Sequence, residues 1–577
     1  MGAGPLSTAV PPGVSTPVPL PGDGPRSPTL PLVALLAALL LGASLSAYRF
    51  LDPDEGRNGE IAREMMGSND YLVPHLNGLP YLDKPIVYFA AAAAVMEVLG
   101  PTERAARLPA WLFTIASLVL VGRWAGRRWG RHAGWLAALA LATMPLVSAY
   151  SRTVIFDSAL AACVAAAVLW LWDGRPVLGW VAMGVGVLVK GPIALTIPLL
   201  AVVPASLATG RGARRLFPLA GLAAFFAVTL PWFIAVSLRH PEFPRYVFVE
   251  ETLQRVTTGR FHRSGPPWYY LPILLVGTFP WIVPALARVR RWRETWRARR
   301  ADPVAADAVL LASWVLVPLA FLTLNQSKLP QYLLPLFPAI ALAAAANLTR
   351  HGHRVAWRPA AVLLALLGIA LVTLPWWLPP PLRMTAEIRA AIPRAAAALG
   401  GAVIAAGALL AAAARRARPG LAGIAYALPV LTVPFVSTDL MRAVGHERSA
   451  AHLAAVVAGA LEQAAGDASA GDVLAVAVYP PSLPFYLGRQ LPVATATATE
   501  LTSNWIVARA ERYRALPGTP LLPADAWRDV LTRCPRPTVF VTRAGDDRVP
   551  AELRTALPLL AVEGRYAAYG PCRPGSP

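Results

Sequence analysis

Lysine is almost missing from this sequence, and charge of either sign is scarce. Only 15% of the 577 residues are charged, whereas about a quarter are charged in an average soluble domain. The chain has three lysines, Lys84, Lys190 and Lys328, among many arginines. Hydrophobic residues make up 56% of it. This composition excludes an ordinary soluble globular protein and makes each lysine a residue that needs an explanation.

Cysteines and metal-binding patterns are also sparse. The sequence has three cysteines and contains no HExxH, paired CxxC or P-loop pattern. We therefore expect no required cofactor, and the use of a divalent metal stays open. Cys163 lies in an apolar run and is expected to be inert packing. Cys534 and Cys572 pair if their segment lies outside the cytoplasm, and stay reduced if it does not.

Long apolar runs are present, and each is close to the roughly 20 residues that a helix needs to cross a bilayer. Examples are Leu30–Ala47, Ala133–Ala149, Leu216–Val236, Ala308–Leu324 and Ala360–Leu378. Backbone polar groups inside lipid must bond within their own segment, so these runs predict helices. Alternating ten-residue strands are missing, which argues against a transmembrane barrel.

The net charge of +21 comes from short basic blocks between apolar runs, which argues for cytoplasmic anchoring loops and against nucleic-acid binding. The blocks are Arg123–Arg131, Arg211–Arg215, Arg288–Arg300, Arg350–Arg358 and Arg415–Arg418. If all of them face the cytoplasm, an even number of spans separates each consecutive pair. This arithmetic gives about thirteen spans and places the C-terminus outside.

The predicted spans cover about 30–48, 104–122, 132–150, 154–172, 176–190, 192–208, 216–238, 268–287, 306–325, 331–348, 358–378, 396–414 and 419–437. The run Ile86–Leu99 is too short for an ordinary crossing and is predicted to be a juxtamembrane helix. The predicted outer loops are 49–85, 151–157, 190–192, 239–267 and 325–331, and they hold most of the unusual polar residues.

Two further regions flank this membrane domain, which we place at 30–438. Residues 1–29 are rich in Pro, Gly and Ser and predict a disordered tail. Polar residues return after about residue 440, so 439–577 predicts a small α/β domain on the outer face. The expected strands there are 473–478 and 538–542, and the expected helices are 449–464 and 524–532.

The first outer loop opens with three acidic residues in four positions, Asp52, Asp54 and Glu55. Glu55–Met66 has the spacing of a helix along the membrane surface. Asp54 therefore has two interpretations, a helix cap or a functional carboxylate. Carboxylates next to a membrane span cost free energy, and this favours the functional interpretation of Asp54.

Further charged residues collect on the same face. Asp157 starts a predicted span, as a structural anchor or as part of the site. Each of the three lysines lies within two residues of a proline on this face. Such a lysine either extends its ammonium group to the membrane interface (snorkelling) or binds a phosphate. Arg260, His262 and Arg263 add to the basic group. The carboxylates can accept a proton, and the cations beside them can hold a phosphate leaving group. Together they suggest transfer of a group from a lipid phosphate.

Several motifs resemble the superfamily of aminoarabinose transferases and protein O-mannosyltransferases. The segments Asp52–Met65 and Asn69–Pro85 are similar to its first outer loop, which is the most specific match. Later matches are Leu188–Pro192, Thr278–Trp281, Ser327–Pro335 and, in the C-terminal domain, Tyr479–Gly488. The resemblance covers nearly the whole chain after residue 30 and implies a GT-C fold.

The resemblance also implies a glycosyltransferase that uses a polyprenyl-phosphate sugar, and we expect the transfer to be inverting. It assigns catalysis to Asp54, with Asp52 less favoured, and to Asp157, and it assigns donor phosphate binding to Lys84, Tyr332 and Arg260 or Arg263. Supporting residues would be Asp52, Glu55, Arg57, Asp83, Lys190, His262 and Lys328. Asn58 and the pair Glu250-Glu251 depart from the family pattern and leave the sugar and the acceptor open.

The expected partners are the lipid-linked donor, a lipid or protein acceptor and membrane lipids, with the site on the outer face of the cytoplasmic membrane. Two alternatives remain. A transporter would use the charged residues as a substrate path, but such groups normally lie at the bilayer midplane in repeated halves. A non-catalytic envelope assembly protein would use the C-terminal domain for binding.

Overall fold

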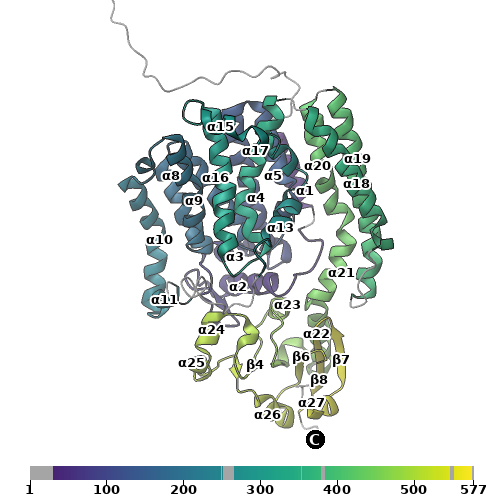
Figure 1. Ribbon diagram of the computed structural model, residues 1–577. Coiled ribbons are helices and arrows are strands. Elements are labelled where there is room, and N and C mark those ends of the chain that lie inside the picture. Colours follow the sequence, from purple (N-terminus) through teal and green to yellow (C-terminus); the bar gives the residue numbers. More distant parts are fainter. Residues whose placement is uncertain are drawn as a thin grey trace, which may run out of the picture.

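A bundle of long helices stands on a smaller α/β domain in the computed structural model of the chain (Figure 1). The structure describes residues 30–43, 45–247, 250, 265–351, 354–377, 384–416, 418–545 and 551–574. The predicted disordered tail and the loop residues Arg260, His262 and Arg263 lie outside the described residues.

Helices occur at all thirteen predicted spans. The bundle consists of α1 (Leu30–Gly42), α3 (Val87–Leu99), α4 (Glu103–Trp129), α5 (Arg131–Ala142), α6 (Pro145–Tyr150), α7 (Asp157–Trp172), α8 (Pro176–Lys190), α9 (Ile193–Thr209), α10 (Leu219–Arg239), α13 (Tyr270–Thr278), α14 (Ile282–Ala285), α16 (Pro303–Leu324), α17 (Phe337–His351), α18 (Arg354–Trp377), α19 (Ala386–Arg416) and α20 (Pro419–Val436). In the described part of the chain, six helices are long and apolar enough to cross a membrane, or up to eight if each bent pair is one span. The chain is therefore a multi-pass membrane protein, and the number thirteen stays a prediction.

Two predicted spans are broken rather than continuous. The run 132–150 divides between α5 and α6 just before Pro145. The run 268–287 divides at Phe279-Pro280, where the helices on either side differ in direction by 106°. Proline supplies no backbone N–H and its ring clashes with the preceding turn, which explains why both helices stop there.

The first loop folds as predicted into a helix, α2 (Asp54–Ser68), which lies between the bundle and the α/β domain (Figure 1). Its Glu55 accepts two hydrogen bonds from the buried Arg107 of α4, each 2.9 Å long. Glu55 also accepts a 3.0 Å bond from the backbone N–H of Val154, before α7. These contacts fix the start of α2 against two membrane helices.

The C-terminal domain is built on a six-stranded sheet in the order β5-β4-β3-β6-β8-β7. The strands are β3 (Asp472–Val476), β4 (Val493–Ala494), β5 (Leu521–Leu522), β6 (Thr538–Arg543), β7 (Leu559–Glu563) and β8 (Tyr566–Cys572). The pairs β5–β4, β4–β3 and β3–β6 are parallel, and β8 and β7 add an antiparallel edge. The predicted α/β class is confirmed, and the predicted helices appear as α22 (Ala451–Ala465) and α26 (Ala526–Arg533).

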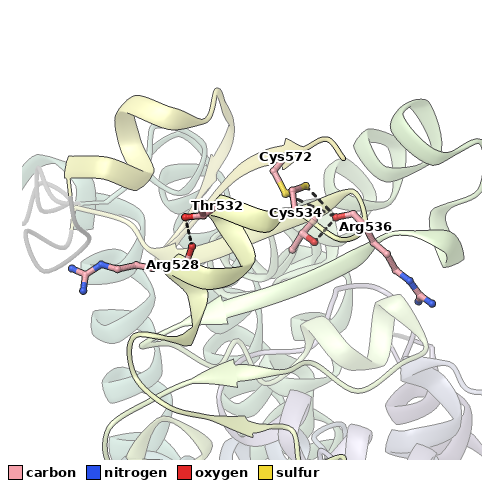
Figure 2. The surroundings of a disulfide bond; sticks show 6 residues. Arg528, Thr532, Cys534, Arg536 and Cys572 are labelled. Carbon is pink, nitrogen blue, oxygen red and sulfur yellow. Dashed lines mark hydrogen bonds between the residues drawn. A yellow bond between two sulfur atoms is a disulfide. The ribbon is translucent and has the colours of Figure 1, made fainter. Parts of the chain in front are cut away.

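Cys534 and Cys572 form a disulfide between the end of α26 and the end of β8 (Figure 2). The bond closes a loop with a sequence separation of 38 residues. Cys163 of α7 is buried and reduced. Of the two alternatives for Cys534 and Cys572, the structure therefore shows the paired one.

Candidate functional site

A cavity of about 1130 Å³ lies where the membrane helices meet α2 and the C-terminal domain. One part of its wall is apolar and comes from α9, α10 and α16, with side chains such as Ile193, Phe226, Leu230, Ile234 and Phe321. The other part is polar. Its charged and hydroxyl side chains from the predicted site are Asp54, Arg57, Asp83, Lys84, Asp157, Lys190 and Tyr332. The cavity therefore has both an apolar wall, suited to a lipid chain, and a charged end.

Asp54 is the first residue of α2, and its carboxylate is half exposed in the cavity, with 49% of the side chain accessible. The cap position belongs to Pro53, and Asp54 accepts a 2.6 Å bond from Arg57 Nη2 instead. The side chain of Arg57 is only 13% exposed. The capping interpretation of Asp54 is thus wrong, and the carboxylate faces the space where a substrate would lie.

Asp157 is the first residue of α7 and is buried against Lys190, the last residue of α8. Their side chains form an ion pair, and Lys190 Nζ also lies 4.7 Å from the ring centre of Tyr332. Tyr332 belongs to η4 (Pro330–Leu336), which precedes α17. Three separate segments thus bring an acid, a cation and a phenol together at the cavity wall.

Asp83 and Lys84 occupy the far end of the first loop. Lys84 Nζ donates a 2.7 Å bond to the backbone oxygen of Asp83. The buried Asp83 carboxylate accepts bonds from Tyr246 Oη, from Ser503 Oγ and from the backbone N–H of Trp505, the last at 3.1 Å. Asp83 thus holds the lysine loop against the C-terminal domain.

Of the predicted site residues that the structure describes, three do not line the cavity. Glu55 is bound to Arg107, and Lys328 is buried outside the cavity wall. Asp52 is directed away, and its Oδ2 accepts a 2.7 Å bond from Ser482 Oγ of the C-terminal domain. Burial raises the pKa of Asp52 to about 7, and the bonds from Ser482 offset only part of that rise. Asp52 and Glu55 therefore act in packing the loop, and only Asp54 of the three acids faces the cavity.

The cavity residues from the C-terminal domain are not among those predicted from the sequence. Thr499, Thr502, Ser503 and Asn504 lie in the segment that follows β4 and form part of the wall. Loops after the carboxyl ends of parallel strands are common sites of ligand contact, and this is the signal that could have found them. Among the described residues there is no cluster of three or more His, Cys, Asp or Glu side chains that could hold a metal ion.

Fold and site together define a multi-pass membrane protein whose cavity presents both an apolar wall and a set of acids and cations. Residues 83–234 match the family model of dolichyl-phosphate-mannose-protein mannosyltransferases. The chain is 34% identical over 388 residues to undecaprenyl phosphate-alpha-4-amino-4-deoxy-L-arabinose arabinosyl transferase 2 of Sodalis glossinidius, covering 63% of this chain and 68% of that protein. It is 33% identical over 365 residues to the transferase of the same type from Aeromonas hydrophila, covering 60% of this chain and 64% of the relative. The chain belongs to the aminoarabinose transferase family.

The crystal structure of ArnT from Cupriavidus metallidurans in the apo state matches with a TM-score of 0.78 and 25% identity, covering 94% of this chain and 97% of that one. The predicted family and GT-C fold are thereby confirmed. The chain spans 64% of the length of the Aeromonas relative and 60% of a Yersinia enterocolitica relative, less than two thirds in each case. The roles of individual site residues stay predictions.

Proposed function

We propose that the protein transfers a sugar from an undecaprenyl-phosphate-linked donor to a lipid acceptor at the outer face of the inner membrane. The relatives are transferases whose names specify undecaprenyl phosphate and 4-amino-4-deoxy-L-arabinose, so this aminosugar is the first donor to test. The observation that carries the proposal is the cavity, because its apolar wall suits a polyprenyl chain and its charged end suits a sugar phosphate.

The donor phosphate would lie beside Lys84 and Tyr332. Both line the charged end of the cavity, and a lysine ammonium is a common phosphate ligand. Lys190 lies against Tyr332 and is neutralised by Asp157, so this group would orient the phenol. As the leaving group gains charge, the cations nearby stabilise it more than they stabilise the intact donor.

Asp54 would act on the acceptor. An acceptor oxygen forms a bond to the anomeric carbon from the face opposite the phosphate, and the bond between that carbon and the phosphate oxygen breaks. The acceptor proton passes to the Asp54 carboxylate, and polyprenyl phosphate leaves. The half-exposed carboxylate, held by Arg57, suits this role of general base.

The proposed orientation has two supports. The basic blocks favour a cytoplasmic location for the loops that contain them. The disulfide between Cys534 and Cys572 is typical of an oxidising compartment, which favours the outer side for the C-terminal domain.

The test is transfer by the purified protein with undecaprenyl-phosphate aminoarabinose as donor and extracted envelope lipid as acceptor, followed by mass spectrometry. Asp54→Asn should lower the transfer rate by at least about a hundredfold and leave donor retention and melting temperature unchanged. Asp529→Asn, on the exposed face of α26, is the matched control and should transfer normally.

Wild-type rates in the Asp54 variant would contradict the role of that residue alone. A wild-type protein that neither retains the lipid-linked donor nor transfers its sugar would contradict the function and leave the transporter and assembly alternatives. Comparing envelope lipids and proteins of cells with active and inactive protein would then decide between a lipid and a protein acceptor.

A further inference from the structure

The segment between β4 and α24 (Asn504–Ala508) brings the C-terminal domain into the cavity. It contains a short helix, η6 (Thr499–Leu501), and Thr502 directly follows it. Thr502 is exposed into the cavity, which it lines together with Thr499 and Ser503. A domain that is distant in sequence therefore contributes directly to the site.

Thr502 has an unusual backbone conformation. Its φ angle is 54°, in the left-handed region, and Ala498 on the other side of η6 has a φ of 59°. A β-branched residue is strained there, and glycine or asparagine is the usual choice. Such strain persists where the surroundings enforce it and concentrates at functional sites. Contacts of the surrounding chain therefore offset the strain at Thr502, and its own hydroxyl makes one of them.

The hydroxyl of Thr502 has a defined partner. Its Oγ1 accepts a 2.9 Å bond from Arg57 Nη1, while Arg57 Nη2 donates the 2.6 Å bond to Asp54. Arg57 Nε is buried without a hydrogen-bond partner among the described residues. The two Nη hydrogen bonds thus fix the rotation of the guanidinium group, and one of them depends on Thr502.

Several hydrogen bonds other than that of Thr502 hold the segment in place. Thr495 Oγ1 donates a 2.7 Å bond to Glu500 and accepts one of 2.9 Å from the backbone N–H of Ala498. Ser503 independently binds Asp83. Removing the hydroxyl of Thr502 alone therefore leaves the segment folded and docked.

We propose that Thr502 is a positioning residue, through which the C-terminal domain orients Arg57 and thereby the Asp54 carboxylate. The inference rests on the proposed transfer reaction. It gives the C-terminal domain a part in the chemistry that neither its fold nor its distance in sequence suggests. Thr502 itself does not act on the reacting atoms.

The test compares Thr502→Val, which removes the hydroxyl and keeps the shape, with Thr502→Ser, which keeps the hydroxyl. The valine variant should lose about tenfold in kcat, because a bond to a charged group is lost, with the donor KM within about twofold. The serine variant should restore most of the rate. Thr532→Val, on the exposed face of α26 (Figure 2), is the matched control and should behave as the wild type.

Thr502→Gly separates positioning from structure. Glycine removes the backbone strain, so the melting temperature should stay equal or rise, while kcat falls as it does in the valine variant. Wild-type kcat in the valine variant, or losses of rate that only follow losses of folded protein, would overturn the inference alone. Absence of transfer by the wild-type protein would overturn the proposed function and the inference with it.

Discussion

Two carboxylates only two positions apart, Asp52 and Asp54, meet opposite environments. Asp52 precedes α2 and is partly buried against Ser482, whereas Asp54 begins the helix and faces the cavity. A Cβ on Gly56 would lie 2.1 Å from Asp52 Oδ1 and 2.6 Å from the backbone nitrogen of Ser482, so the contact needs a glycine there. Asp52 thus joins the first loop to the C-terminal domain, whereas Asp54 is accessible to a substrate in the cavity.

Asp52→Asn should keep transfer within about twofold of the wild-type rate, in contrast to Asp54→Asn. It should also change the pH dependence of stability. Burial raises the pKa of Asp52 to about 7, above its value of 3.8 in the unfolded chain. Its contribution to stability is therefore fully present below about pH 4 and is lost as the pH rises through about 7. The melting temperature of the wild type should fall more between pH 5 and 8 than that of the variant, and parallel curves would contradict this assignment.

Helix α2 and the hairpin after it contact both the membrane helices and the C-terminal domain. Glu55 joins α2 to α4 through the buried Arg107, and Asn77, in the hairpin that follows, exchanges two 2.7 Å bonds with the backbone of Leu491 in the C-terminal domain. The position of Asp54 therefore depends on contacts with both halves of the molecule.

Glu55→Ala should destabilise the protein by about 3–5 kcal/mol, because it leaves the Arg107 guanidinium buried without its carboxylate. Arg49→Ala breaks a neighbouring pair with Glu103 in which the arginine is 61% exposed, and should cost less than about 1 kcal/mol. Thermal unfolding of both variants in the same detergent measures the difference. Equal losses would show that the buried pair does not fix α2.

At the scale of the whole molecule, the two ends of the structure should lie on opposite sides of the membrane. Arg214, between α9 and α10, and Thr497, in the C-terminal domain, are both exposed. In a Cys163→Ala background, Thr497→Cys should react with an impermeant maleimide in intact cells, and Arg214→Cys should react only after permeabilisation. The reverse pattern would invert the predicted topology.

The sequence predicts most of this architecture because long apolar runs have few alternatives in a bilayer. The breaks at Pro145 and Pro280 could not be predicted, since Pro109 of α4 and Pro231 of α10 lie inside continuous helices. Asp54 and Lys84 could be found because they lie in one motif-rich loop.

Thr502 and Ser503 could not be found in the same way. Their partners Arg57 and Asp83 are 445 and 420 residues away in sequence, and a hydroxyl in a polar segment carries no local signature of such contacts. Tertiary contact alone gives these two residues their place in the cavity.

These separations have a consequence for biosynthesis. The loop that contains Arg57 and Asp83 leaves the ribosome long before the segment that completes its contacts. A nascent or truncated chain can insert its membrane helices, yet its cavity stays without one wall until residues 499–507 have been made. Premature termination anywhere before β4 should therefore give an inserted but inactive protein.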